Sequence, residues 1–257
     1  MAILNTINSD YHKIIIEEEY PIRKLCFGKG SCREQSAIDL TNLRLHVYDY
    51  TKLLMHAYIF SPMPKRILFI GLGGGVVPRE SEFYFNSLVN IDIIEIDPVV
   101  VQVAKDYFFF NESKKTSLIL GDALDVVKKI KDQYDIVFID AYDTNYIPLP
   151  LTSIEFIESI YPIVSDNGLI AVNASSFHPS FYPHLNAIYS VFGNNIYITN
   201  GFTNILAAVI FASKKDLRMV CPSSEFCHFL SQKPEKAKIT SNILNAKIFS
   251  LYNDSKE

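Results

Sequence analysis

The sequence predicts an α/β fold in which a small antiparallel β-domain precedes a doubly wound, mostly parallel sheet. Three observations predict it. Apolar and charged runs alternate near the N-terminus, short apolar runs alternate with helical patterns in the middle of the chain, and a glycine cluster closes the first of those runs. The 257 residues and 49% hydrophobic content suffice for one large domain with an appendage.

The N-terminal part carries the pattern of short strands. Residues 13–19 and 22–27 are apolar runs edged by charge, and Gly28 and Gly30 follow them, which suits two or three antiparallel strands joined by a glycine turn. Asp49 to Phe60 then shows helical spacing. We therefore expect a β-domain over residues 1–48, a large α/β domain over 49–215 and a C-terminal extension over 216–257.

The large domain alternates strand and helix patterns, which is typical of a parallel sheet covered by helices. The expected strands are Arg66–Ile70, Asn90–Glu95, Thr116–Leu120, Ile136–Ile139 and Gly168–Asn173, with Asn204–Ala212 as a later edge strand. The expected helices are Pro98–Phe108, Ala123–Lys131 and Thr152–Tyr161. Ligands of such folds bind at the carboxyl ends of the strands.

A glycine cluster and a distant acid indicate a nucleoside site. Gly71, Gly73, Gly74 and Gly75 follow the first buried strand and remove the Cβ atoms that keep a ligand from the backbone. Glu95 ends the second strand, where a carboxylate with two acceptor oxygens can hold the hydroxyl pair of a ribose. The alternative is a tight turn whose glycines serve only packing.

Further acids follow the other strand ends. Asp97 comes just after the second strand, Asp122 follows the third, and Asp140 and Asp143 follow the fourth. For Asp122 a helix cap is as good a hypothesis as ligand contact, and for the last pair a cap or turn is the alternative. Two acids at a low-dielectric rim raise one pKa and favour proton acceptance, so Asp140 is the candidate base.

Bulk properties limit the partners. A net charge of −4 and a pI near 5.9 give no basic surface for binding nucleic acid, so we expect a small-molecule or cationic partner. The first residues lack a basic leader and no apolar stretch is long enough for a membrane span, which predicts a cytoplasmic protein. The four cysteines are then expected to be reduced thiols, without zinc-like spacing to histidines.

The ordered motifs resemble the spermidine synthase family of polyamine aminopropyltransferases, in its bacterial spermidine synthase-like branch. The resemblance rests on the segments Ile-Gly-Leu-Gly-Gly-Gly, Pro-Arg-Glu, Ile-Glu-Ile-Asp-Pro, Gly-Asp-Ala, Tyr-Asp-Ile-Val-Phe-Ile-Asp-Ala-Tyr-Asp and Ile-Pro-Leu-Pro-Leu-Thr-Ser, in that order from residue 70 to residue 153. It extends back to Glu34 and forward to about Ala212. It implies a methyltransferase-like Rossmann core, a small N-terminal β-domain and a homodimer formed through the N-terminal part.

The resemblance also implies roles for individual residues. The donor would be decarboxylated S-adenosylmethionine, with Glu95 on its ribose and Asp122 on its adenine, and no metal is implied. Asp140 would deprotonate the attacking amine and Asp143 would help to hold it. The remaining residues implied in donor or amine binding are Gly71, Gly73, Gly75, Asp97, Ala123 and Gln35 for the donor and Tyr50 for the amine.

Two departures keep other functions open. Gly74 stands where the family has an acid, and Thr51-Lys52 stand where it has His-Glu. Losing that acid removes a repulsion against a methionine carboxylate, and Lys52 has the charge to pair with one, which favours methyl transfer from intact S-adenosylmethionine as the alternative. A catalytically weak nucleoside-binding paralogue and a nicotinamide-dependent dehydrogenase are the further hypotheses.

Overall fold

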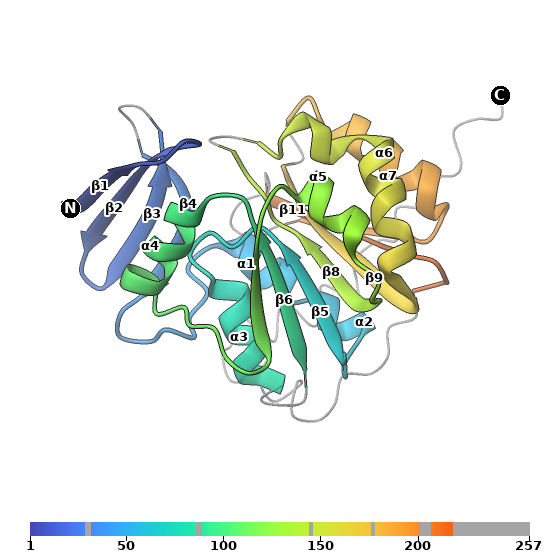
Figure 1. The fold of residues 1–257 in the computed structure, drawn as a ribbon, viewed down its shortest axis with the longest axis horizontal. Coiled ribbons are helices and arrows are strands. Elements are labelled where there is room, and N and C mark those ends of the chain that lie inside the picture. The colour runs from blue at the N-terminus through green and yellow to red at the C-terminus, as the bar shows by residue number, and fades with distance from the viewer. Residues whose placement is uncertain (29–31, 86–88, 144–145, 176–177, 201–206, 218–257) are drawn as a thin grey trace.

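The computed structural model describes residues 1–28, 32–85, 89–143, 146–175, 178–200 and 207–217. Its N-terminal part is an antiparallel sheet in the order β1 (Ala2–Asn8), β2 (Lys13–Glu19), β3 (Ile22–Phe27) and β4 (Arg33–Asp39) (Figure 1). The small sheet therefore has four strands, where the sequence predicted two or three. β1 escaped prediction because most of its side chains are exposed, so its sequence has no apolar face.

The large sheet has the order β10-β11-β9-β8-β5-β6-β7 within the described residues. Its strands are β5 (Arg66–Ile70), β6 (Asn90–Glu95), β7 (Thr116–Leu120), β8 (Tyr134–Ile139), β9 (Val164–Ser175), β10 (Ile196–Asn200) and β11 (Ala207–Ser213). The first five are parallel, and β11 and β10 join antiparallel. The predicted mostly parallel sheet is confirmed.

One predicted position in this sheet is wrong. The strand predicted at Asn204–Ala212 is not an edge, because β11 lies between β9 and β10 and its first predicted residues, 204–206, fall outside the described part of the chain. β10 is the true edge, with Ile198 paired to Ile210. Its residues, Ile-Tyr-Ile-Thr-Asn, favour a strand, but five residues are too few to show a clear period in the sequence.

The helices are α1 (Asp49–Leu54), α2 (Ala57–Phe60), α3 (Val76–Phe85), α4 (Pro98–Phe108), α5 (Ala123–Val126), α6 (Ile154–Ile160) and α7 (Phe181–Phe192). The helix predicted over Asp49–Phe60 is broken at Met55. The backbone N–H of Met55 donates to the carbonyl oxygens of Thr51 and Leu53 in a tightened turn. The helix predicted over Ala123–Lys131 is shorter, because a 3-10 turn replaces it from Val127 to Lys129.

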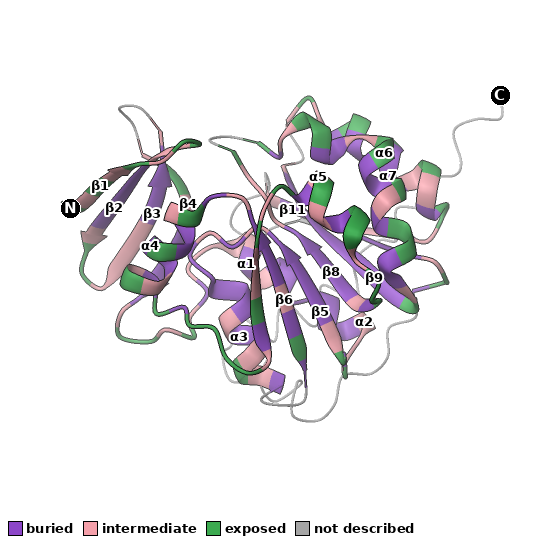
Figure 2. Ribbon diagram, viewed as in Figure 1, coloured by how far each residue is buried: buried purple, intermediate pink, exposed green. Residues whose placement is uncertain are grey.

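The central strands of the large sheet are buried along most of their length (Figure 2), and their side chains alternate between two cores. Leu68 and Ile70 of β5 pack with α5, α6 and α7, whereas Ile67 and Phe69 pack with α1 to α4 on the opposite face. A third cluster joins the small sheet to α3 and α4. The small sheet is therefore fixed beside the carboxyl ends of the parallel strands, where the site lies.

The structure corrects one expectation about the cysteines. Cys26 and Cys32 are not reduced thiols. They form a disulfide, with Cα atoms 5.0 Å apart, because the end of β3 and the start of β4 bring them together. Cys221 and Cys227 lie outside the described residues, as does nearly all of the predicted extension over 216–257. In the part of the chain that the structure describes, no helix is long and apolar enough to cross a membrane. The boundaries at residues 48 and 215 stay predictions.

Candidate active site

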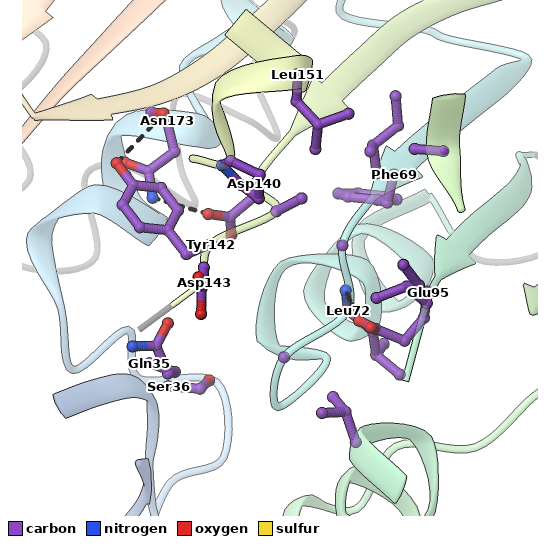
Figure 3. Close-up of a pocket in the computed structure, with 18 of the residues that line it drawn as sticks. Gln35, Ser36, Phe69, Leu72, Glu95, Asp140, Tyr142, Asp143, Leu151 and Asn173 are labelled. Atoms are coloured by element: carbon purple, nitrogen blue, oxygen red, sulfur yellow. Dashed lines mark hydrogen bonds between the residues drawn. The ribbon is translucent and has the colours of Figure 1, made fainter. Parts of the chain in front are cut away.

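A cavity of about 640 Å³ lies at the carboxyl ends of β5, β6, β8 and β9, with the small sheet forming one wall (Figure 3). Most predicted site residues line it, namely Gln35, Tyr50, Gly71, Gly73, Glu95, Asp122, Ala123, Asp140 and Asp143. Gly75 and Asp97 are not part of the lining. The tertiary fold thus brings together residues that are more than 100 positions apart in the sequence.

The glycine turn has two different roles along its length. Gly71 has φ +97°, and a Cβ there would lie 2.4 Å from the backbone oxygen of Asp140, so glycine is required for the loops after β5 and β8 to meet. Gly73 has φ +54° and a Cβ there would meet nothing within 4 Å, so it faces open cavity space. Gly75 instead packs against the Phe110 ring.

Glu95 sits at the end of β6 with its carboxylate already positioned. One carboxylate oxygen accepts from the Leu72 N–H at 2.9 Å and the other from the Asp97 N–H at 3.0 Å. The side chain is buried apart from its access to the cavity, and this burial raises the pKa of Glu95 while the backbone bonds oppose the rise. Each oxygen retains a lone pair, which suits two adjacent hydroxyl donors of a ribose.

Asp97 and Asp122 cap the helices that follow their strands. Asp97 accepts from the Val99 N–H at 2.8 Å and from the Ser9 hydroxyl at 2.5 Å, and it is fully buried. Asp122 accepts from the Leu124 N–H at 2.9 Å, so the cap considered for it is present. Asp122 also lines the cavity, which leaves a second carboxylate oxygen for a ligand.

Asp140 lies at the end of β8 and faces the cavity. The Asn173 amide on β9 donates to Asp140 Oδ1 at 2.7 Å, as Figure 3 shows. Desolvation raises the pKa of Asp140 to about 7, and the bond from Asn173 partly offsets the rise. A carboxylate with such a pKa can both accept and return a proton near neutral pH.

Asp143 stands at the mouth of the cavity, with its side chain mostly exposed. Its Oδ1 lies 3.6 Å from Nδ1 of His12, which stacks on Phe27 with ring centroids 4.0 Å apart. Burial lowers the pKa of His12, and the carboxylates of Asp143 and Asp97 oppose the drop. The small sheet thereby contributes an imidazole beside the acid expected to hold the amine.

The other predicted contacts are placed around this pair of acids. The Tyr50 hydroxyl donates to the backbone oxygen of Gln35 at 2.8 Å, and burial together with the nearby Asp140 raises the pKa of Tyr50. Lys52 points elsewhere: its Nζ pairs with Asp49 at 3.2 Å, and it does not line the cavity. The proposed pairing of Lys52 with a donor carboxylate therefore has no support in the structure.

Two site residues were missed from the sequence. Asn173 reads as the end of an apolar strand, and His12 belongs to a hairpin turn far from every motif. Asn173 carried a usable signal, because a polar residue at the carboxyl end of a buried parallel strand lies at the ligand edge. His12 carried none, since only the docking of the small sheet brings it to Asp143.

Comparison with known proteins identifies the family. The sequence profile of the spermine/spermidine synthase domain matches residues 48–190, which is more than half of the chain. The chain belongs to this family. The resemblance read from the motifs is thus confirmed.

A named relative agrees with this placement. The polyamine aminopropyltransferase of Vibrio vulnificus is 37% identical over 203 residues, which are 75% of this chain and 66% of that protein, so the match spans just under two thirds of the relative's length.

Solved structures of other proteins share the fold of this spermine/spermidine synthase family member. A spermidine synthase in complex with the transition-state analogue AdoDATO superposes with a TM-score of 0.67 at 20% identity, covering 94% of this chain and 88% of that one. Human methyltransferase-like protein 13 with SAH superposes at 0.61 and 19% identity, covering 77% and 93%. The methyltransferase-like Rossmann core and the separate N-terminal sheet are therefore established.

Proposed function

We propose that this protein is an aminopropyltransferase that moves an aminopropyl group from decarboxylated S-adenosylmethionine to a di- or polyamine. The observation that carries the proposal is Asp140: a carboxylate with a pKa near 7, held by Asn173 and facing the cavity beside a second acid. Membership in the family, and the names of its relatives, support the same reaction.

The donor fits the nucleoside half of the cavity. Glu95 offers acceptor oxygens to the ribose, Asp122 faces the same space, and Gly73 leaves the backbone open to the ligand. A volume of about 640 Å³ has room for a nucleoside and an aliphatic amine together. These residues would bind and orient the sulfonium carbon toward Asp140.

The reaction needs a base that deprotonates the amine and charged groups that hold the amine in line for attack, and the chain supplies both. Asp140 takes one proton from the protonated amine, which frees the nitrogen lone pair. The lone pair forms a C–N bond at the carbon next to the sulfonium, the C–S bond breaks, and its electrons stay on sulfur as neutral methylthioadenosine leaves. Asp143, together with Asp140, supplies negative charge that holds a cationic acceptor in line.

The deciding experiment offers both donors to the same preparation. With decarboxylated S-adenosylmethionine and a panel of diamines we expect release of methylthioadenosine, and with intact S-adenosylmethionine we expect no S-adenosylhomocysteine. Gly74 is the reason to include the second donor: a Cβ at this position would lie 2.6 Å from Ser36 Oγ, so a neutral hydroxyl fills the place of an acidic side chain. The reverse result would replace this proposal with methyl transfer.

The catalytic role of Asp140 is tested by Asp140→Asn. The amide keeps the size of the side chain but removes its basicity, so kcat should fall by about 10²-fold or more while donor affinity stays within about twofold. Asp125→Asn, at an exposed position in the first turn of α5, is the matched control and should leave kcat unchanged. Near wild-type turnover in Asp140→Asn rejects the base assignment.

Assembly and location complete the proposal. We expect a homodimer formed through the N-terminal sheet, and the edge strand β1 supports it by exposing Ile3 and Leu4. Light scattering of the full chain tests this directly. A cytoplasmic location stays a prediction, and the Cys26–Cys32 disulfide is uncommon in that compartment.

A further inference from the structure

The outer face of the small sheet holds a buried carboxylate next to two sulfur atoms. Ile14 and Ile16 of β2 pack toward α4 in the third core cluster, so Ile15 and Glu17 point to the opposite face. Cys26 pairs with Ile15 in the ladder, which makes Glu17 its diagonal neighbour on that outer face. Glu17 is only 7% exposed and Cys26 is fully buried.

Glu17 has no satisfactory partner in the disulfide state. Its Oε2 lies 4.0 Å from Cys26 Sγ, but a disulfide sulfur carries no hydrogen to donate. Lys24, opposite Glu17 in the ladder, bonds to Glu34 instead. Among the described residues no other group bonds the Glu17 carboxylate. A carboxylate that is largely withdrawn from solvent and accepts from no other protein donor is available to bind a cation.

We propose that Cys26, Cys32 and Glu17 bind a thiophilic divalent cation of the Zn²⁺ class when the two cysteines are reduced. The Sγ atoms and a Glu17 oxygen all lie within 4.8 Å of one another. Tetrahedral zinc with Zn–S near 2.3 Å and Zn–O near 2.1 Å places neighbouring ligand atoms roughly 3.5–3.8 Å apart, so opening the S–S bond and rotating side chains suffices.

The charges and protons balance in this state. Opening the disulfide takes two electrons and two protons from a reductant, and metal binding then releases the two thiol protons. Two thiolates and one carboxylate surround the dication, with a fourth position for solvent beside the half-buried Cys32. The same sulfurs cannot be bonded to each other and ligate a metal, so oxidation and metal binding exclude each other.

This site is separate from the proposed reaction and does not depend on it. None of the three ligands lines the catalytic cavity, although Phe27 and Arg33, the neighbours of the cysteines in the sequence, do. The cation would tie β2 to the ends of β3 and β4 next to that wall. Binding is therefore measured without any assay of turnover.

The test titrates Zn²⁺ into the full chain after reduction with a phosphine and removal of metal, using a chromophoric chelator as competitor. We expect one equivalent bound by the reduced chain, none at this affinity by the oxidised chain, and a thiolate charge-transfer band when Co²⁺ replaces Zn²⁺. Zinc should also raise the Tm of the reduced chain, because it binds the folded state.

Variants separate the ligands from other thiols. Cys32→Ser should weaken zinc binding by at least about 100-fold and Glu17→Gln by about 10-fold or more, since each removes one of three protein ligands. The double variant Cys221→Ser/Cys227→Ser is the matched control and should bind as the wild type does. No binding by the reduced wild type, or loss of binding in the control, overturns the site. Unchanged affinity in folded Glu17→Gln overturns its assignment as a ligand.

Discussion

Asp140 combines a catalytic benefit with a cost in stability. Its carboxyl has a pKa of about 7 in the folded chain because it is desolvated, against roughly 3.9 in an unfolded chain. The folded state therefore holds the proton more tightly than the unfolded state does. The contribution of Asp140 to the free energy of unfolding is therefore greatest below the unfolded pKa and falls as the pH rises to about 7.

This difference predicts opposite pH trends for activity and stability. The base acts when ionised, so kcat/KM should fall as the pH drops below about 7, while the contribution of Asp140 to the free energy of unfolding should rise. Asp140→Asn should be more stable than the wild type near pH 8 by about 1–3 kcal/mol, and equal to it near pH 4. Denaturant unfolding across this range checks both points. A constant difference at all pH values would contradict the coupling.

Asn173 offers an independent check on the same group. The hydrogen bond that the Asn173 side-chain amide donates favours the ionised form of Asp140. Asn173→Ala should therefore raise the pKa of Asp140 and move the inflection of kcat/KM to higher pH. A purely structural role for Asn173 would lower activity without moving the inflection.

Glu95 gives the second prediction at the scale of single residues. Glu95→Gln keeps the shape but removes the charge, so donor affinity should weaken by about 1.5–3 kcal/mol. Calorimetric titration with decarboxylated S-adenosylmethionine measures it. Asp92→Asn is the control, because Asp92 lies on the same strand but bonds Arg66 and Tyr134. Unchanged donor affinity in folded Glu95→Gln would remove Glu95 from the ribose site.

At the scale of elements, the turn from β5 to α3 decides where the ligand can approach. Gly71 and Gly73 both have positive φ, yet only Gly71 touches another backbone, that of Asp140. The sequence presents these glycines as equivalent. Their different roles come from β8, which ends beside β5 because the two strands pair.

Alanine at each glycine separates packing from ligand approach. Gly71→Ala should lower the free energy of unfolding by about 2–4 kcal/mol, from the backbone clash plus the left-handed strain. Gly73→Ala should cost only about 1–2 kcal/mol of strain but weaken donor binding. Chemical denaturation and donor titration of both variants measure this. Equal stability loss at the two positions would contradict the prediction.

At the scale of the whole molecule, the small sheet is attached to the Rossmann core by a few polar contacts besides the shared apolar cluster. Ser9 donates to the fully buried Asp97, Asn5 donates to the Tyr107 hydroxyl at 2.8 Å, and Arg23 donates to the Tyr107 backbone oxygen at 2.8 Å. These contacts hold His12 and Gln35 at the cavity wall. The site is complete only when both parts are docked.

Ser9→Ala tests this attachment. Removing the hydroxyl leaves one oxygen of Asp97 without its donor, so the free energy of unfolding should fall by about 1–3 kcal/mol and acceptor KM should rise. Ser190→Ala, on the exposed face of α7, should change neither quantity. If the Ser9 variant matches the wild type in both, the contact does not hold the two parts together.

The fold class, the family and the strand ends that carry acids could all be predicted from the amino-acid sequence. Buried parallel strands are continuous apolar runs, and their ends are marked by glycine or acid, so Glu95, Asp122 and Asp140 could be placed at one edge from local pattern alone. The same logic did not find β1, whose side chains are mostly exposed, or β10, whose five residues are too few to show a period.

Which of these residues share a site depends on contacts that form only in the folded chain. The fold turned Asp97 toward Ser9 rather than the cavity, paired Lys52 with Asp49, joined Cys26 to Cys32, and brought Asn173 and His12 to the two acids. Such contacts depend on strand order and on the docking of the small sheet. Because they join residues far apart in the chain, no local periodicity records them.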